Sequence, residues 1–304
     1  MTSAVCVVQA RTGSTRLPGK VLLELGGRPL LEFLLERLSP LAIPVVVATS
    51  DLSTDDPIAD LATRRGVGIV RGDERDVLDR FALALDAHPA EHLVRLTADS
   101  PLVDPAIIAA ALTHHLDAGA DYTSNTLART YPDGLDVEVL RASALAEART
   151  EATDSDEREH VTPFVYRRPT RFALAALCSG DQLGTERWTI DTADDLERVR
   201  AIVDALDAPT AAGWREVLEV AGRPAAPQPG QLWLRPECWS GLEFRRRWDA
   251  VVDNATVASV EATLTRVGSA DLSYDGPRAS EDDARRLARE ALRADKQYDL
   301  VDDV

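Results

Sequence analysis

The sequence predicts an α/β fold in which a mostly parallel β-sheet lies between two layers of helices. In the first two-thirds of the 304 residues, short β-branched runs alternate with segments whose apolar residues recur at helical spacing. That alternation is typical of βαβ units. The strands are short and continuously apolar, as in VVVA at 45–48, which suits a sheet buried on both faces. Apolar residues make up 45% and charged residues 28%, as in an ordinary globular protein.

The expected elements follow in order along the chain. Strands are predicted at residues 4–8, 45–48, 67–70 and 92–96, and helices at residues 30–38, 57–65, 77–87 and 105–116. Residues 120–172 are less regular, with a turn at 131–134, a strand-like LDVEVL at 135–140 and then a helix. Regularity returns with a strand at 188–190 and a capped helix that begins near Asp191. We expect His114 and His115 to lie on a surface helix without a functional role.

The chain is expected to divide into three segments. These are a main domain at residues 1–222, a Pro-rich linker at 223–236, and a small C-terminal α+β extension of unknown role at 237–304. An apolar cluster follows the linker prolines, and it consists of Leu232, Trp233, Leu234, Trp239, Leu242, Phe244 and Trp248. We expect it to pack on its own chain or on a dimer mate, because large apolar patches are rarely left in water.

Charge and cysteine content exclude several classes of protein. Lys and Arg total 34 and Asp and Glu total 51, which gives a net charge of −17. This balance argues against nonspecific binding to nucleic acid or to an anionic membrane. The three cysteines form no CxxC pattern, and the sequence shows neither a signal peptide nor a membrane-spanning run. The sequence therefore predicts a cytoplasmic location.

The strongest local pattern is QARTGSTRLPGK at residues 9–20, directly after the first strand. Ligands of parallel α/β sheets bind beyond the carboxyl ends of the strands, where glycines let backbone N–H groups approach phosphate oxygens. Arg11, Arg16 and Lys20 supply the local positive charge that an acidic protein needs to hold a triphosphate. The spacing is neither GxxxxGK[ST] nor GxGxxG, which disfavours a P-loop ATPase and a dinucleotide site. The alternative is a solvated basic turn.

QARTGSTRLPGKVL resembles the signature loop of the cytidylyltransferases that activate sugar acids, namely the CMP-ketodeoxyoctonate and CMP-acylneuraminate synthetases, and most of all their SpsF-like branch. Four further motifs follow in the family's order: LTADSPLVDP, SNTLARTYPDGLDVEVL, REHVTPFVY and WTIDTADDLERV. The resemblance covers residues 5–206. It implies a Rossmann-like three-layer sandwich, as in GT-A-like nucleotidyltransferases, with CTP as substrate, Mg²⁺ as cofactor and a homodimer as the assembly.

The resemblance also implies which residues bind the nucleotide. The expected set is Gln9, Ala10, Arg11, Gly13, Ser14, Arg16, Lys20, Arg71 and Thr97. Arg11 and Lys20 are expected to be catalytic, and with Arg16 they would neutralise charge on the β- and γ-phosphates. For Arg71, a place near the base or ribose and a bland place at the charged start of a helix are equally open.

Two carboxylates are candidates for the metal. Asp99 and Asp191 are each expected to end a strand at the edge where the phosphate loop lies. Two carboxylates from separate strands can hold Mg²⁺ against phosphate oxygens, with water completing the shell. The family resemblance implies the same role. The alternatives are a turn residue before Pro101 for Asp99 and a helix N-cap for Asp191.

The acceptor side is expected to involve acidic residues. The resemblance suggests acceptor contacts from Tyr131, Asp133, Asp136, Glu138, Glu159 and His160, with Asp136 and Glu138 on one face of a strand. His160 is a candidate general base, and a packed or surface histidine is the equal alternative. Because carboxylates would repel a sugar acid, this composition is a weak hint against a sialic-acid-type acceptor.

The predicted function is transfer of CMP from CTP to a sugar, sugar acid or related small molecule, with release of pyrophosphate. One alternative is a GT-A-like glycosyltransferase of polysaccharide or natural-product biosynthesis. The intact phosphate loop disfavours it, because a triphosphate needs those cations more than a sugar diphosphate does. The other alternative is a non-catalytic nucleotide-binding scaffold, which the retained loop and both carboxylates disfavour.

Overall fold

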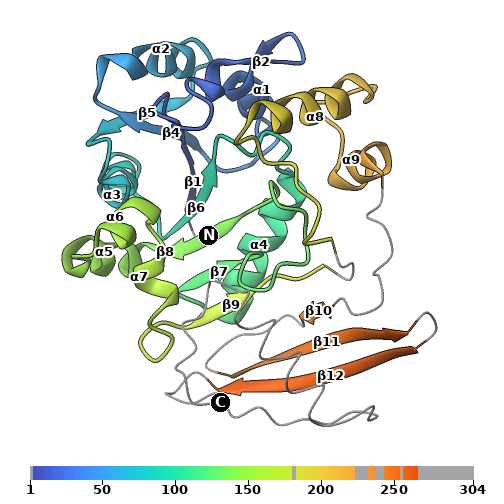
Figure 1. Ribbon diagram of the computed structural model, residues 1–304. Helices are drawn as coiled ribbons and strands as arrows, with labels where there is room; N and C mark the ends of the chain where they lie inside the picture. The colour runs from blue at the N-terminus through green and yellow to red at the C-terminus, as the bar shows by residue number, and fades with distance from the viewer. Residues whose placement is uncertain (1–2, 180–182, 223–231, 237–242, 254–255, 266–304) are drawn as a thin grey trace.

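The computed structural model describes residues 3–179, 183–222, 232–236, 243–253 and 256–265. Its main feature is a seven-stranded sheet in the order β5-β4-β1-β6-β8-β7-β9 (Figure 1). The strands are β1 (Ala4–Gln9), β4 (Val45–Ser50), β5 (Gly68–Gly72), β6 (His92–Thr97), β7 (Tyr122–Ser124), β8 (Glu138–Arg141) and β9 (Leu174–Ala176). β1, β4, β5 and β6 pair in parallel, β8 is antiparallel to both its neighbours, and β7 pairs with β9 in parallel. The mostly parallel α/β fold is therefore confirmed.

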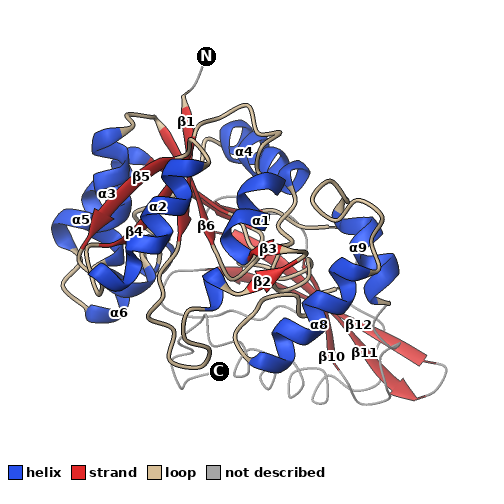
Figure 2. Ribbon diagram, turned by 90° about the horizontal axis from the view of Figure 1, so that it is seen from above, coloured by secondary structure: helices blue, strands red, loops and turns tan. Residues whose placement is uncertain are grey.

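Helices cover both faces of this sheet, as the view from above shows (Figure 2). The face that holds Cys6 and Val8 of β1 packs against α1 (Leu30–Arg37), α2 (Asp56–Arg64), α4 (Pro105–Ala118), α8 (Ala193–Asp204) and α9 (Trp214–Ala221). The face that holds Val5 and Val7 packs against α3 (Val77–Ala87), α5 (Ala142–Glu151) and α7 (Pro163–Tyr166), and the short α6 (Ser155–His160) contacts α3. Successive β1 side chains thus enter opposite cores, as the period-2 geometry of a strand requires.

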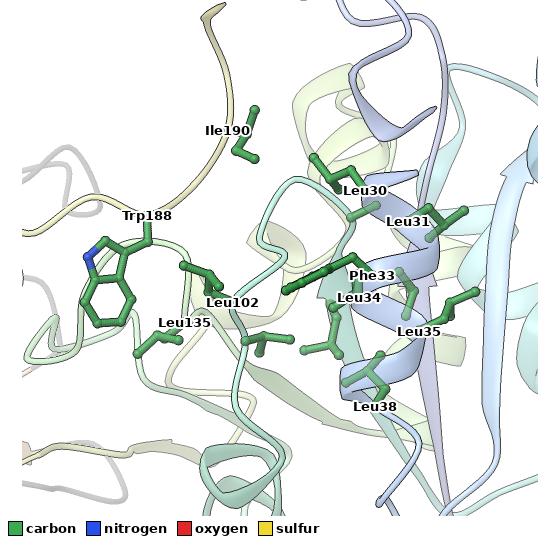
Figure 3. Close-up of a cluster of buried hydrophobic side chains, with 14 of the residues drawn as sticks. Leu30, Leu31, Phe33, Leu34, Leu35, Leu38, Leu102, Leu135, Trp188 and Ile190 are labelled. Atoms are coloured by element: carbon green, nitrogen blue, oxygen red, sulfur yellow. The ribbon is translucent and has the colours of Figure 1, made fainter. Parts of the chain in front are cut away.

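The larger core is built around α1. Its buried residues Leu30, Leu31, Phe33, Leu34, Leu35 and Leu38 lie near Leu102, Leu135, Trp188 and Ile190 (Figure 3). Just before α1, the short helix η1 (Lys20–Leu22) leads into the hairpin of β2 (Glu24–Leu25) and β3 (Arg28–Pro29). These elements pack the segment after β1 against the core. The loop between β1 and η1 therefore begins and ends at well-packed residues.

The early elements match the prediction. Two later elements and the position of one histidine differ from it. Residues 188–190 are extended but form no strand, and a single bridge from Arg187 to Asp133 stands in its place. The strand predicted at 135–140 is β8, which begins only at Glu138, so Asp136 precedes it. His115 is fully buried within α4, so its predicted surface position is wrong. Its ring lies 2.9 Å from both His92 Nδ1 and Thr123 Oγ1, which compensates for burying a polar group.

The C-terminal part contains a three-stranded antiparallel sheet of β10 (Leu232–Pro236), β11 (Glu243–Asp253) and β12 (Thr256–Thr265). β10 falls inside the segment predicted as a linker, so that the end of this segment is a paired strand. The side chains of the predicted apolar cluster lie outside the described part of the structure, as do Trp239 and Leu242 entirely. The three-segment division stays a prediction. Within the described residues, none of the helices has the length and apolarity to cross a membrane.

Candidate active site

The loop after β1 is held in place by one buried carboxylate, Asp55, at the end of η2 (Ser53–Asp55). Its Oδ1 accepts from the Thr12 backbone N–H at 2.8 Å and from Thr12 Oγ1 at 2.5 Å. Its Oδ2 accepts from Thr49 Oγ1 and from the N–H and hydroxyl of Ser50. Burial alone would raise the pKa of Asp55, but the hydrogen bonds from Ser50 and Thr12 outweigh it and lower the pKa. The loop is therefore fixed at Thr12 by an ionised group.

The loop ends in a turn that directs Lys20 into the protein. Gly19 has φ 69°, a left-handed conformation that glycine adopts without strain, and its N–H donates to Thr12 O at 2.9 Å. Lys20 is 8% exposed. Its Nζ donates to Asp99 Oδ2 at 2.8 Å, Ile190 O at 2.8 Å and Asp191 Oδ1 at 3.0 Å. One ammonium group thus joins the phosphate loop to both predicted metal ligands.

Asp191 does not cap the following helix. Thr192 is the N-cap of α8, and it forms a capping box with Asp195. The Asp191 carboxylate is therefore available to cations, and it contacts Lys20, Arg16 at 2.9 Å and Arg187 at 2.6 Å. Burial opposes ionisation of this carboxyl, but Lys20 and Arg187 prevail and lower its pKa. The N-cap alternative for Asp191 is wrong.

Asp99 and Asp191 suit a cation that is shared with a phosphate. Asp99 lies two residues after β6, and Asp191 lies in the extended segment before α8. Because Lys20 Nζ contacts an oxygen of each, the two carboxylates converge on one point. In the described part of the chain, no group of three or more His, Cys, Asp or Glu residues could enclose a metal by itself. Two converging carboxylates fit Mg²⁺, which usually takes one or two carboxylates and completes its shell with water and substrate phosphates.

A cavity of about 240 Å³ opens beside β6 and β8. Its wall includes Arg95, Thr97, Arg129, Asp136, Glu138 and His160. Four of the predicted site residues, Thr97, Asp136, Glu138 and His160, therefore line it. Tyr131, Asp133 and Glu159 do not. Tyr131 is buried and packs edge-on against the Trp214 ring, with centroids 5.6 Å apart, so its place is in the core.

Each acidic residue of the predicted acceptor side is paired with an arginine. Arg129 donates from both terminal nitrogens to the two oxygens of Asp136, at 2.8 and 2.9 Å. Arg187 Nη1 donates to Asp133 Oδ2 at 2.9 Å, although burial and then Asp136 raise the pKa of Asp133. These pairs neutralise the carboxylates. The argument that acidic residues would repel a sugar acid therefore fails.

Glu138 is a structural member of the cavity wall. It is 8% exposed, and its carboxylate accepts from Tyr122 OH at 2.6 Å, from Thr162 Oγ1 at 2.7 Å and from Arg95. Arg95 also donates to Gln9 Oε1 at 3.1 Å. The oxygens of Glu138 are therefore taken up by protein donors, and the residue fixes the wall rather than presenting a free carboxylate.

The remaining predicted residues have varied settings. Arg11 makes a long 3.5 Å contact to Glu159, and the exposed His160 lies 3.5 Å from Asp156. Arg71 donates to Ser50 O and Leu52 O, and pairs with Asp56. All its terminal nitrogens contact protein, and Arg71 lies in β5 rather than at the start of a helix. The other contacts are Ala10 N–H to Ala48 O, Ser14 Oγ with Leu17 N–H, Thr97 Oγ1 with Ser100 Oγ, and Gly13 against the Glu74 side chain.

A family model for cytidylyltransferases matches residues 5–203. The chain belongs to the cytidylyltransferase family. It is 36% identical over 211 residues to the spore coat polysaccharide biosynthesis protein SpsF of Bacillus subtilis, covering 66% of this chain and 87% of that protein. It is 28% identical over 221 residues to the 3-deoxy-manno-octulosonate cytidylyltransferase of Methylorubrum populi, covering 66% and 85%. A solved cytidylyltransferase from Leptospira borgpetersenii is 30% identical, with a TM-score of 0.70 over 72% of this chain and 94% of that chain.

The family predicted from the five motifs is thus confirmed, and the structure adds site residues that sequence reasoning missed in this cytidylyltransferase. Asp55 holds the loop, Arg187 links Asp133 to Asp191, and Arg129 and Arg95 neutralise the cavity wall. Sequence signals pointed to two of these four residues. Arg129 lies inside the quoted motif SNTLARTYPDG, and Arg187 directly precedes WTID.

Proposed function

We propose that this chain transfers CMP from CTP to a hydroxyl of a sugar, sugar acid or related small molecule, with release of pyrophosphate and dependence on Mg²⁺. One observation carries the proposal. Lys20, the last residue of the phosphate loop, joins Asp99 and Asp191 through a single ammonium group, near a polar cavity on the neighbouring strands. Nucleotide, metal and acceptor sites are then adjacent at one edge of the sheet.

Each group of site residues would have its own role in the reaction. The loop N–H groups and the exposed Arg16 would receive the β- and γ-phosphates. Asp99 and Asp191 would hold Mg²⁺, which when bound would polarise the α-phosphate. Lys20 would turn from the two carboxylates toward oxygens of the α-phosphate and hold its positive charge beside them. The acceleration would come mainly from positioning and from charges held ready for the transition state.

A sugar acid is the acceptor class we favour. The paired carboxylates of the cavity carry no uncompensated negative charge, and Arg95 and Arg129 place guanidinium groups in its wall. Hydroxyls of the acceptor would meet Thr162 and Tyr166, which also line the cavity. The relative from Methylorubrum populi is named for 3-deoxy-manno-octulosonate, which is an acid of this class. A homodimer and a cytoplasmic location stay predictions from the sequence, and light scattering tests the first.

The test couples nucleotide binding to turnover. Thermal stabilisation by each NTP, with and without Mg²⁺, should be largest for CTP with Mg²⁺. Pyrophosphate release with CTP and a panel of sugar acids and neutral sugars then identifies the acceptor class. Stabilisation by nucleotide sugars but by no NTP would refute the proposal in favour of a glycosyltransferase. Tight CTP binding without pyrophosphate release for any acceptor would favour a scaffold.

The variant Asp136→Asn tests the acceptor cavity separately. It breaks the two-pronged pair with Arg129 in the cavity wall, and it leaves the loop and the two carboxylates untouched. We expect a loss of about 10-fold or more in kcat/KM for the acceptor, with CTP affinity unchanged. Asp117→Asn, on the exposed side of α4, is the matched control. An equal loss of acceptor turnover and CTP affinity would refute the assignment of this cavity.

A further inference from the structure

Val161, between α6 and α7, has a backbone conformation that valine rarely adopts. Its φ is 73° and its ψ is −56°, and in the described part of the chain it is the single residue other than glycine with a positive φ. These angles belong to a strained kind of γ-turn, with φ near about +75° and ψ near about −65°. The hydrogen bond that closes such a turn is present, from Thr162 N–H to His160 O at 2.8 Å. Because a β-branched side chain makes a positive φ especially unfavourable, the surrounding structure must impose this turn.

Contacts on both sides of Val161 hold the turn in place. The Val161 side chain is 0% exposed and belongs to the core on the face of the sheet that α3, α5 and α7 cover. Its N–H donates to Glu157 O at 3.1 Å, at the end of α6. On the other side, Thr162 Oγ1 donates to the buried carboxylate of Glu138 at 2.7 Å. A relaxed backbone at Val161 would therefore withdraw either the valine from the core or Thr162 from Glu138.

The turn brings both of its flanking residues to the cavity beside β6 and β8. His160 and Thr162 line this cavity, whereas Val161 between them packs in the core. The connection is short, since α6 ends at His160 and α7 begins at Pro163. A γ-turn changes the direction of the chain within three residues. The strained residue itself therefore lies outside the cavity, and its effect on the cavity passes through its two neighbours.

Thr162 uses its hydroxyl for the cavity wall rather than for its own helix. It is the N-cap of α7, a position where a hydroxyl ordinarily accepts from a free helix N–H, but its side chain makes no such bond. Its hydrogen is donated to Glu138 Oε1, which also accepts from Tyr122 OH at 2.6 Å. A hydroxyl whose hydrogen is committed can only accept further hydrogen bonds. Thr162 Oγ1 therefore suits a hydroxyl of a bound molecule and disfavours a carboxylate at this point.

We propose that Val161 is a positioning residue for the acceptor, because its strained turn holds Thr162 Oγ1 in the cavity wall, where it accepts a hydrogen bond from an acceptor hydroxyl. This inference rests on the proposed function. A relaxed turn would let Thr162 take up several orientations. Displacing a group that orients a substrate by about 1 Å can lower the rate about 100-fold. The unfavourable φ at Val161 would thus reduce stability in exchange for a fixed acceptor contact.

Paired substitutions at Val161 separate the backbone strain from the loss of the side chain. Val161→Ala and Val161→Gly both remove the buried isopropyl group, but alanine keeps the unfavourable φ and glycine relieves it. The control pair is Val165→Ala and Val165→Gly, at a fully buried valine of the same core in α7. We expect Val161→Gly to melt about 2–4 °C above Val161→Ala. Val165→Gly should melt below Val165→Ala, because glycine weakens an ordinary helical position.

Steady-state kinetics of the full chain provide the second measurement. The substrates are CTP with Mg²⁺ and the sugar acid on which the wild type releases pyrophosphate fastest. Relative to Val161→Ala, Val161→Gly should raise the KM for the acceptor by about 5- to 10-fold, with the KM for CTP equal within about twofold. The more stable variant of the pair would then be the poorer enzyme. A purely structural role predicts otherwise, since loss of folded protein lowers kcat and changes neither KM.

Substitutions of Thr162 test the same contact from its own side chain. Thr162→Val removes the hydroxyl and should raise the KM for the acceptor, whereas Thr162→Ser keeps the hydroxyl and should recover most of this loss. These two variants decide the question if neither Val161 variant folds. Equal acceptor KM values for Val161→Ala and Val161→Gly, or a lower melting temperature for Val161→Gly, would overturn the inference. Wild-type protein that binds CTP but releases pyrophosphate with no acceptor would refute the proposed function itself.

Discussion

The contacts of Asp55 make a quantitative prediction possible. Its two oxygens have separate tasks: Oδ1 holds Thr12 in the phosphate loop, and Oδ2 holds Thr49 and Ser50 at the end of β4. Asp55→Asn has the same shape but replaces one oxygen with an NH₂ group. Whichever way the amide turns, the NH₂ group meets a backbone N–H, either that of Thr12 or that of Ser50. One buried donor is then left without an acceptor.

The magnitude follows from those contacts. An unsatisfied buried N–H costs about 1–3 kcal/mol, and the surviving bonds lose the strengthening that a charged acceptor gives. We therefore expect Asp55→Asn to lower the free energy of unfolding by about 2–4 kcal/mol. If the amide turns its NH₂ group toward Thr12, the loop also loses its anchor. CTP affinity should then fall even under conditions in which the variant is fully folded.

Urea unfolding and CTP titration together form the assay. The control is Asp60→Asn, which changes the same chemical group at an exposed position of α2. The control should shift the free energy of unfolding by less than about 0.5 kcal/mol. If Asp55→Asn behaves like this control in both measurements, the loop is held by something other than Asp55, and the reasoning from its five contacts is refuted.

Two further predictions concern the buried side chains of His115 and Arg37. Burial, and then the neighbouring His92, lower the pKa of His115 to about 3. Below pH 6.5 the unfolded chain therefore binds a proton that the folded chain excludes until about pH 3. Above pH 6.5 this histidine does not affect the free energy of unfolding. Between pH 6.5 and about pH 3 the free energy of unfolding falls as the pH falls, by about 1.4 kcal/mol per pH unit. His115→Gln should flatten this slope in urea titrations at pH 7.5 and 5, and an unchanged slope would contradict the assignment. Arg37, 1% exposed, donates to the carbonyls of Leu102, Val103, Pro209 and Ala212. Arg37→Met should cost about 3–5 kcal/mol of stability in the same assay, and a cost below about 1 kcal/mol would show that water replaces the guanidinium.

Periodicity predicted most of the main domain because it reports burial directly. It failed where a residue is buried but does not belong to a strand of the sheet. Trp188 and Ile190 are 0% exposed, as residues of a buried strand would be. They lie instead in an extended segment whose N–H groups donate to Asp133 O and Asp99 O without forming a strand of the sheet. The prediction of a surface position for His115 failed for the opposite reason. Its polarity suggested a surface position, and only the fold brings His92 and Thr123 to its ring.

The parts of the candidate site that lie within one short stretch of sequence could be predicted. The phosphate loop is contiguous in sequence, and Asp99 and Asp191 stand in recognisable motifs. Its ion pairs join distant segments, as Lys20 does with Asp191, and no spacing rule shows them. Arg80 of α3 was hidden for a related reason. In the sequence it resembles a charge on the exposed face of a helix, and only the structure shows that it is buried, with no hydrogen-bond partner among the described residues.

The ion pairs of the site also bear on how an acidic protein can bind a triphosphate. Arg16 and Lys20 are already bound to Asp191 in the described structure, so neither is a free cation waiting for phosphate. In the proposed reaction, Arg16 and Lys20 would shift toward phosphate oxygens as the two carboxylates take up a divalent cation. Nucleotide and metal would then each remove the charge that opposes the other. CTP affinity without Mg²⁺ should therefore be weak, and the two should bind with positive coupling.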